Sequence, residues 1–190
     1  MEFVTVNGLS TGSLLSQLGT ALRTKDNLEE MADASRICLD LSKADWFTPA
    51  FLSPVSIVLQ DLAEDTEVDI RYPEGGHQSY LDQIGFPFGY VDPPMDYRNH
   101  LPLCRLNTDT DEDVIEIVSS KIVDLIGRTF SDLSPDARTG IKYPLSEIID
   151  NVDQHSQCDH GAVLIQNYPN KNYLDICVAD DGVSIPGNYE

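Results

Sequence analysis

The chain has 190 residues, 41% hydrophobic and 23% charged, which is the composition of a globular protein able to bury a core. Its 32 acidic residues against 12 Lys and Arg give a net charge of -20, so no basic stripe can form and we expect no direct nucleic-acid partner. The sequence has no run of about 18 apolar residues, so we also expect no membrane span.

The cysteines and the N-terminus indicate a cytoplasmic location. The 4 cysteines are scattered without a C-x-x-C pair, as is typical of reduced, buried thiols. Residues 1–6 lack the basic region and apolar stretch of a signal peptide. The acidic residues are dispersed, with 22 Asp against 10 Glu, a pattern typical of proteins that stay soluble at high ionic strength.

The first half of the chain alternates helical and strand patterns. Leucines at helical spacing predict the first helix, with Ser10 or Thr11 as its cap, and an alternation of acidic and apolar residues predicts the second strand. The expected elements are a helix over 10–22, a strand over 36–41, a helix over 49–62, a strand over 67–72 and a helix over 76–84 closed by Gly85. This order predicts a small α/β layer.

A proline-rich connector follows this layer. Residues 86–102 contain 4 prolines and no clear periodicity, and residues 103–106 have the pattern of one further strand. A polar, acidic segment then begins at Asn107. We therefore place a domain boundary near residue 108, which divides the chain into residues 1–107 and 108–190.

The run from Ile37 to Leu52, followed by a helix, a strand and residues 79–86, resembles a STAS-type domain. That family couples a strand and an aspartate-containing turn to a following helix, and its phosphorylated members carry Asp-Ser-Ser/Thr-Gly in the turn. Here the matching place reads Phe-Thr-Pro-Ala over residues 47–50. Thr48 is the candidate hydroxyl, and we expect it to cap the helix. The resemblance implies an interaction or sensor module; an unrelated small α/β domain is the alternative.

The second half of the chain predicts two helices and a hairpin. Dense apolar spacing predicts a long helix over residues 113–130. A polar loop over 131–140 and a second helix over 144–155 come next. Two short apolar runs, residues 161–168 and 172–179, are joined by Pro-Asn-Lys and predict an antiparallel hairpin.

The second of these helices carries a polar stripe. Glu147, Asn151 and His155 recur every four residues and share one face. Apolar residues occupy the other face: Leu145, Ile148, Ile149 and Val152. Such a stripe is by itself typical of a solvated helix face, so its meaning depends on the residues downstream of the helix.

Downstream of this helix lie the hairpin and the sequence Asp-Asp-Gly-Val-Ser-Ile-Pro over residues 180–186. Residues 145–156 resemble the N box (Glu-x-x-x-Asn-x-x-x-His) of the GHKL ATPase superfamily, and residues 180–186 resemble its first glycine box (Asp-x-Gly-x-Gly-Ile-Pro). This superfamily includes histidine kinases, anti-sigma-factor kinases, gyrase and mismatch-repair ATPases. The implied fold class is α/β (α+β): a STAS-like domain, then part of a GHKL-type sandwich of two helices and a β-hairpin.

The resemblance also implies roles for five residues. Asn151 would be an oxygen ligand for Mg²⁺, and Glu147 would be the catalytic base that orients or deprotonates the attacking group. Asp180 would accept a hydrogen bond from the adenine amino group of ATP, and Gly182 would let the backbone approach the base. Ser184, also assigned to the cofactor site, stands where the family usually has its second glycine. The family's lid and second glycine box are not in the sequence, so we expect a fragment of a longer protein or a pocket completed by a partner.

The resulting hypothesis is an ATP-binding regulatory protein that hydrolyses ATP or phosphorylates a protein partner, with a second copy of the chain as a further candidate partner. We expect weak nucleotide binding and little turnover from these 190 residues. The alternative is a non-enzymatic interaction scaffold, supported by Ser184 and the missing lid. A third interpretation is a zinc site at His155, Cys158 and His160, although their spacing matches no common zinc motif and a fourth ligand is missing.

Overall fold

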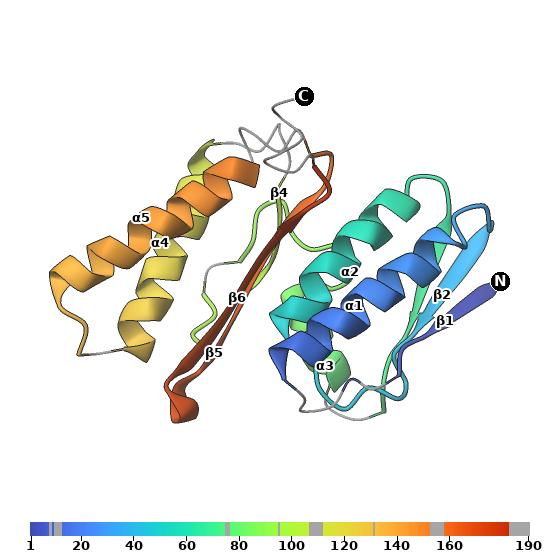
Figure 1. Ribbon diagram of the computed structural model, residues 1–190, viewed down its shortest axis with the longest axis horizontal. Coiled ribbons are helices and arrows are strands. Elements are labelled where there is room, and N and C mark those ends of the chain that lie inside the picture. Colours follow the sequence, from blue (N-terminus) through green and yellow to red (C-terminus); the bar gives the residue numbers. More distant parts are fainter. Residues whose placement is uncertain are drawn as a thin grey trace.

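The computed structural model describes residues 1–7, 9, 13–74, 77–94, 96–106, 112–130, 132–152 and 158–182. These residues form helices and two three-stranded sheets, so the expected mixed α/β (α+β) class is confirmed. Figure 1 shows four layers: the first sheet, helices α1 and α2, the second sheet, and helices α4 and α5. Within the described part of the chain, no helix is both long and apolar enough to cross a membrane.

The first sheet is parallel, with the strand order β1-β2-β3. Its elements are β1 (Glu2–Thr5), α1 (Leu14–Glu29), β2 (Arg36–Asp40), α2 (Pro49–Leu62), β3 (Glu67–Arg71) and α3 (His77–Ile84). The bounds of α2 are those expected from the sequence, and Gly85 ends α3 with a φ of 76°. Strand β1 was not predicted, because its four residues are too short to give a clear alternation.

The second sheet is antiparallel, with the order β4-β5-β6. Its elements are β4 (His100–Leu106), α4 (Glu112–Thr129), α5 (Pro135–Asp150), β5 (Gly161–Tyr168), a short 3-10 helix (Pro169–Lys171) and β6 (Tyr173–Asp180). The predicted hairpin is confirmed by the pairing of β5 with β6 from Gly161 opposite Asp180 to Tyr168 opposite Tyr173.

Strand β5 is buried on both faces. Ala162 and Leu164 belong to the core formed with α2, whereas Val163 and Ile165 belong to the core formed with α4 and α5. Alternate side chains of a strand point to opposite faces, so one strand supplies both cores. This arrangement explains why the sequence of β5 is a continuous apolar run and not an alternation.

The predicted boundary near residue 108 falls between β4 and α4. Strand β4 lies before the boundary, yet it pairs with β5, with Leu106 opposite Gly161. Leu103 of β4 and Leu164 of β5 also belong to the same core as α2. The segments on the two sides of residue 108 therefore share one sheet and one core, and the division into two domains stays a prediction about the organisation of the chain.

Helix α5 begins earlier than predicted, inside the expected loop over 131–140. The side chain of Ser134 accepts a hydrogen bond from the amide of Ala137 at 3.2 Å, and Pro135 occupies the first helical position. Both features start helices, because a cap partner is supplied and proline has no amide to satisfy there. The helix then continues through Pro144. The end of the predicted helix, residues 153–155, lies outside the described residues.

Helix α1 buries its polar face. It runs to Glu29, beyond the predicted end, and Ser13 caps it by accepting from the amide of Ser16 at 3.3 Å; the predicted caps lie outside the described residues. The buried Thr20 and Thr24 donate to backbone carbonyls one turn earlier, at 3.0 and 2.8 Å, so their hydroxyls are satisfied inside the protein. The leucines lie outside, with exposed fractions of 54%, 79%, 38% and 51% for Leu14, Leu15, Leu18 and Leu22.

Candidate functional site

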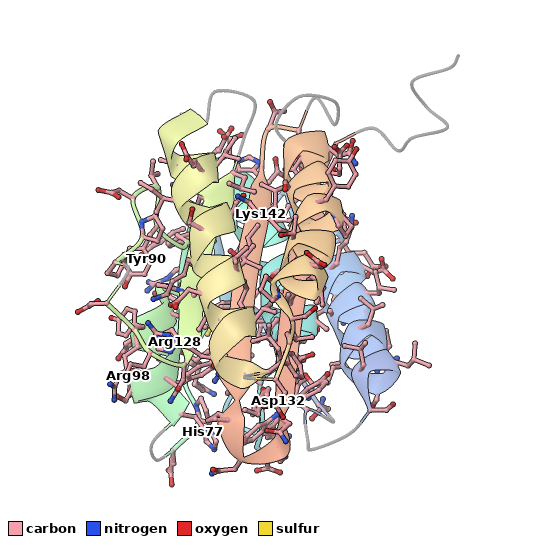
Figure 2. All side chains as sticks on the ribbon, turned by 90° about the vertical axis from the view of Figure 1, so that its left-hand side faces the viewer. His77, Tyr90, Arg98, Arg128, Asp132 and Lys142 are labelled. Carbon is pink, nitrogen blue, oxygen red and sulfur yellow. The ribbon has the colours of Figure 1, made fainter. Side chains whose placement is uncertain are left out.

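Glu147 and Asn151, the described residues of the predicted polar stripe, are exposed. Figure 2 shows α4 and α5 side by side over the second sheet, and Ile149 and Val152 bury the inner face of α5. Glu147 is exposed, and its hydrogen bond with Tyr143, one turn earlier, raises the pKa of that tyrosine. Asn151 is the C-cap residue; its side chain is exposed, and its backbone amide donates to the carbonyls of Glu147 and Ile149.

The end of α5 meets the open end of the β5–β6 hairpin. A Cβ atom added to Gly161 would lie 2.8 Å from Val152 Cγ1, so the side chain of Val152 rests directly on this glycine. Gly161 is paired with Asp180 across the hairpin. Because Asn151 immediately precedes Val152, the contact brings Asn151 and Asp180 to the same end of the second sheet. The two predicted motifs therefore meet the second sheet at the same end.

Asp180 begins the turn that succeeds β6. Its side chain is exposed, and its Oδ1 accepts a hydrogen bond from the amide of Gly182 at 3.0 Å. This bond is an Asx turn, in which an aspartate holds the backbone two residues later. It fixes the direction of the carboxylate and keeps Gly182 beside it. Ser184, like His155, lies outside the described residues.

The neighbouring Asp181 makes two contacts with His160, and sequence analysis missed it. Asp181 accepts from the backbone amide of His160 at 3.0 Å, and its Oδ2 lies 3.1 Å from His160 Nδ1. His160 is buried, and its Nε2 lies 3.6 Å from Glu64, just beyond the end of α2. The interactions attach the turn after β6 to the start of β5. The predicted hairpin contained a signal for this contact. Gly161 pairs with Asp180, so the next residues outward, His160 and Asp181, are expected to face each other.

The proposed zinc ligands have other contacts. The thiol of Cys158 is buried and donates to the carbonyl of Val152 at 3.5 Å, while His160 is held by Asp181. Among the described residues, no group of three or more His, Cys, Asp or Glu side chains is arranged to hold a metal ion. His155, the third proposed ligand, lies outside them, so the zinc interpretation has no support from Cys158 and His160.

The turn that resembles the STAS phosphorylation site is buried. Thr48 is at the N-cap position of α2, as expected, but its hydroxyl does not cap the helix. It donates to Gln17 Oε1 of α1 at 3.2 Å, because the polar buried face of α1 supplies an acceptor there. With 8% of its surface exposed, Thr48 is closed to a modifying enzyme in this conformation.

Comparison with known proteins adds no relative. The chain has no significant match among protein-family models, curated protein sequences or solved structures.

Proposed function

We propose that the end of α5 and the turn after β6 form half of a GHKL-type binding site for Mg-ATP. The observation that carries this proposal is the contact of Val152 with Gly161, the pairing partner of Asp180. It supports a shared site for two motifs that are about thirty residues apart in the sequence. Asn151 at the end of α5 exposes an amide oxygen, and Asp180 at the open end of the hairpin exposes a carboxylate, which are the groups that the proposed ligand requires.

Each residue has a distinct proposed role. The side-chain oxygen of Asn151 ligates Mg²⁺, which prefers hard oxygen donors and bridges phosphates. Glu147, one turn earlier, orients or deprotonates the attacking water or the hydroxyl of a partner protein. Asp180 accepts from the adenine amino group, Gly182 keeps the backbone close to the base, and Ser184 is a further residue proposed for the cofactor site. When bound, Mg²⁺ supplies charge neutralisation to the phosphates.

In this proposal the chain belongs to a cytoplasmic regulatory protein that hydrolyses ATP or transfers its phosphate to a partner. All four cysteines are reduced thiols, which supports a reducing compartment. The alternative, a non-enzymatic scaffold, is favoured by a different observation: four leucines of α1 are exposed in one stripe, as in a surface that contacts another protein.

Isothermal calorimetry with Mg-ATP distinguishes these two functions. We expect weak, saturable heat from the wild-type chain and an affinity at least about 10-fold lower in Asp180→Asn, because the adenine amino group loses a charged acceptor. Asn151→Ala should abolish the difference between titrations with and without Mg²⁺. Asp26→Asn is the matched control, since it makes the same change at an exposed aspartate on α1 that belongs to neither binding site. Equal affinities of wild type and Asp180→Asn would reject the proposed site.

A further inference from the structure

A groove lined by aromatic side chains lies at the opposite end of the β5–β6 hairpin. Three elements of the first half, α1, the loop before α2, and α3, meet the hairpin turn there, and Figure 2 shows His77 of α3 at this end of the molecule. The aromatic groove, as we call it, has two lobes of about 230 Å³ each. Trp46 and Tyr168 line both lobes. About seven residue steps along β5, roughly 23 Å, separate the groove from Gly161.

The aromatic rings of the groove pack against one another in a row, with Trp46 and Tyr173 at its two ends. Trp46 stacks on Tyr168 with ring centroids 6.1 Å apart, and Tyr168 stacks on Tyr173 with centroids 5.7 Å apart. Lys171 lies over the Tyr168 ring, 5.7 Å from its centroid. Such rings bind planar heterocycles by stacking, largely independently of which heterocycle is bound.

The second lobe also contains polar atoms without a partner. Among the described residues, the buried hydroxyls of Tyr80 and Tyr168 and the side-chain oxygen of Gln166 make no hydrogen bond. The Gln166 amide nitrogen donates to the carbonyls of Asn99 and Asn167, which fixes the oxygen as the free atom. Both tyrosine hydroxyls are protonated at neutral pH and can donate, and burial raises the pKa of both further above its usual value. Buried polar atoms normally have partners, so a bound molecule with both donors and acceptors would satisfy them.

Charge in the first lobe favours an uncharged molecule. Lys171 supplies one positive charge, and Asp175 supplies one negative charge that also accepts a hydrogen bond from the Tyr173 hydroxyl at 2.6 Å. These charges offset each other, and the chain as a whole carries a net charge of -20. A phosphorylated molecule would therefore find no net attraction at the groove.

We propose that the aromatic groove binds a neutral nucleoside. Its planar base stacks on Trp46, which is at the end of the row of rings and lines both lobes, and the ring N–H and carbonyl groups of the base pair with Gln166 and the two tyrosine hydroxyls. The groove lies at the other end of the hairpin from Asp180, so this inference does not depend on the Mg-ATP proposal. It assigns a second, separate recognition site to the contact between the two halves of the chain.

The chain provides its own reporter for the experiment, since Trp46 is its single tryptophan. Guanosine, adenosine and uridine are titrated separately while the fluorescence and the indole N–H resonance of Trp46 are recorded. We expect a saturable change with at least one nucleoside at concentrations up to about 1 mM, the weak end of specific affinities. If none of the three changes the Trp46 signals, the proposal is overturned.

Variants then test the contacts. Tyr80→Phe and Tyr168→Phe keep the ring but remove the hydroxyl, so each should weaken the binding nucleoside about 3- to 10-fold. Tyr143→Phe removes a hydroxyl from an exposed tyrosine on α5 and should bind like wild type. Thermal unfolding with and without nucleoside checks that each variant is folded. Unchanged affinity in both groove variants contradicts the proposed contacts, and Asp180→Asn should keep nucleoside binding even if it loses Mg-ATP.

Discussion

The two sheets of this protein reverse the usual relation between sheet type and burial. Parallel sheets usually have both faces covered, whereas antiparallel sheets often expose one face. Here the parallel sheet β1-β2-β3 has α1 and α2 on one side, and its other face lies at the edge of the molecule (Figure 1). The antiparallel sheet β4-β5-β6 lies between helices of both halves. The number of covered faces is thus set by position in the layers and not by strand direction.

The outer face of the parallel sheet is compatible with water because of its side chains. Arg36 forms an ion pair with Asp69 of the neighbouring strand at 2.6 Å, and Arg71 pairs with Asp40 at 3.1 Å. The guanidinium of Arg71 also lies over the Phe3 ring, 5.3 Å from its centroid. On this face, cross-strand pairs of opposite charge stand where a sheet covered by helices on both sides would have apolar side chains.

The largest expected effect distinguishes the two sheets by their packing. Leu164 is fully buried between the second sheet and α2, so Leu164→Ala should lower the free energy of unfolding by about 2–5 kcal/mol. Phe3→Ala, on the outer face of the first sheet, should cost less than about 1 kcal/mol, since Phe3 is already 46% exposed. Urea unfolding measures both changes. Similar losses in the two variants would show that the outer face is packed as tightly as the centre.

A smaller effect is expected where α5 touches the second sheet. Gly161→Ala would place a Cβ 2.8 Å from Val152 Cγ1 and 3.1 Å from the carbonyl oxygen of Leu106, and should destabilise the protein by about 1–3 kcal/mol. Gly140→Ala is the control, because nothing lies within 4 Å of its added Cβ in α5. That change should stabilise the protein by about 0.5–1 kcal/mol. Equal stability of the two variants would contradict the close contact at Gly161.

The smallest expected effects are changes of stability with pH, which differ between one group in each sheet. Burial, with a contribution from Lys121, lowers the pKa of His100 in β4, so the unfolded chain binds this proton first and stability falls as the pH drops below about 6.5. Burial opposes ionisation of Asp40 in β2, but hydrogen bonds from Ser42 and the pairing with Arg71 outweigh it and hold the pKa below its usual value. The contribution of Asp40 to the free energy of unfolding is complete above about pH 3.9 and is lost as the pH falls towards the pKa of Asp40 in the folded protein.

Thermal unfolding over a pH series tests this separation. His100→Gln should reduce the pH dependence of the melting temperature just below pH 6.5 and leave its decrease at more acidic pH unchanged. Asp40→Asn should reduce only that decrease, below about pH 4. A His100→Gln profile parallel to that of wild type would mean that His100 titrates alike in both states.

Local signals predicted much of the fold. Pro49 and the apolar run after it determined α2, Gly85 marked the end of α3, and the Pro-Asn-Lys link predicted the hairpin. Features that depend on distant contacts could not be predicted in this way. The outward orientation of the α1 leucines depends on which face of α1 packs against α2, which the sequence of α1 alone does not show. The pairing of β4 with β5 joins strands more than fifty residues apart.

The candidate site shows the same limit. Periodicity predicted that Glu147 and Asn151 share a helix face, and both are exposed on α5. The contact of Val152 with the start of β5 depends on a glycine at position 161, which has no side chain to show periodicity. The contact of His160 with Asp181 depends on the register of β5 and β6. The resemblance to two short motifs gives no information about that register, because the hairpin lies between the motifs.

The exposed leucine stripe of α1 has a consequence for the behaviour of the protein in solution. Each molecule carries a net charge of -20, and in dilute buffer this charge keeps molecules apart before their leucines can touch. The range of that repulsion is about 10 Å at 0.1 M salt and about 3 Å at 1 M. Salt therefore removes the barrier to contact while apolar contacts persist. The leucine stripe predicts a colloidal stability that decreases as ionic strength rises, whereas the dispersed acidic composition predicts solubility at high ionic strength, and light scattering over a salt series distinguishes the two.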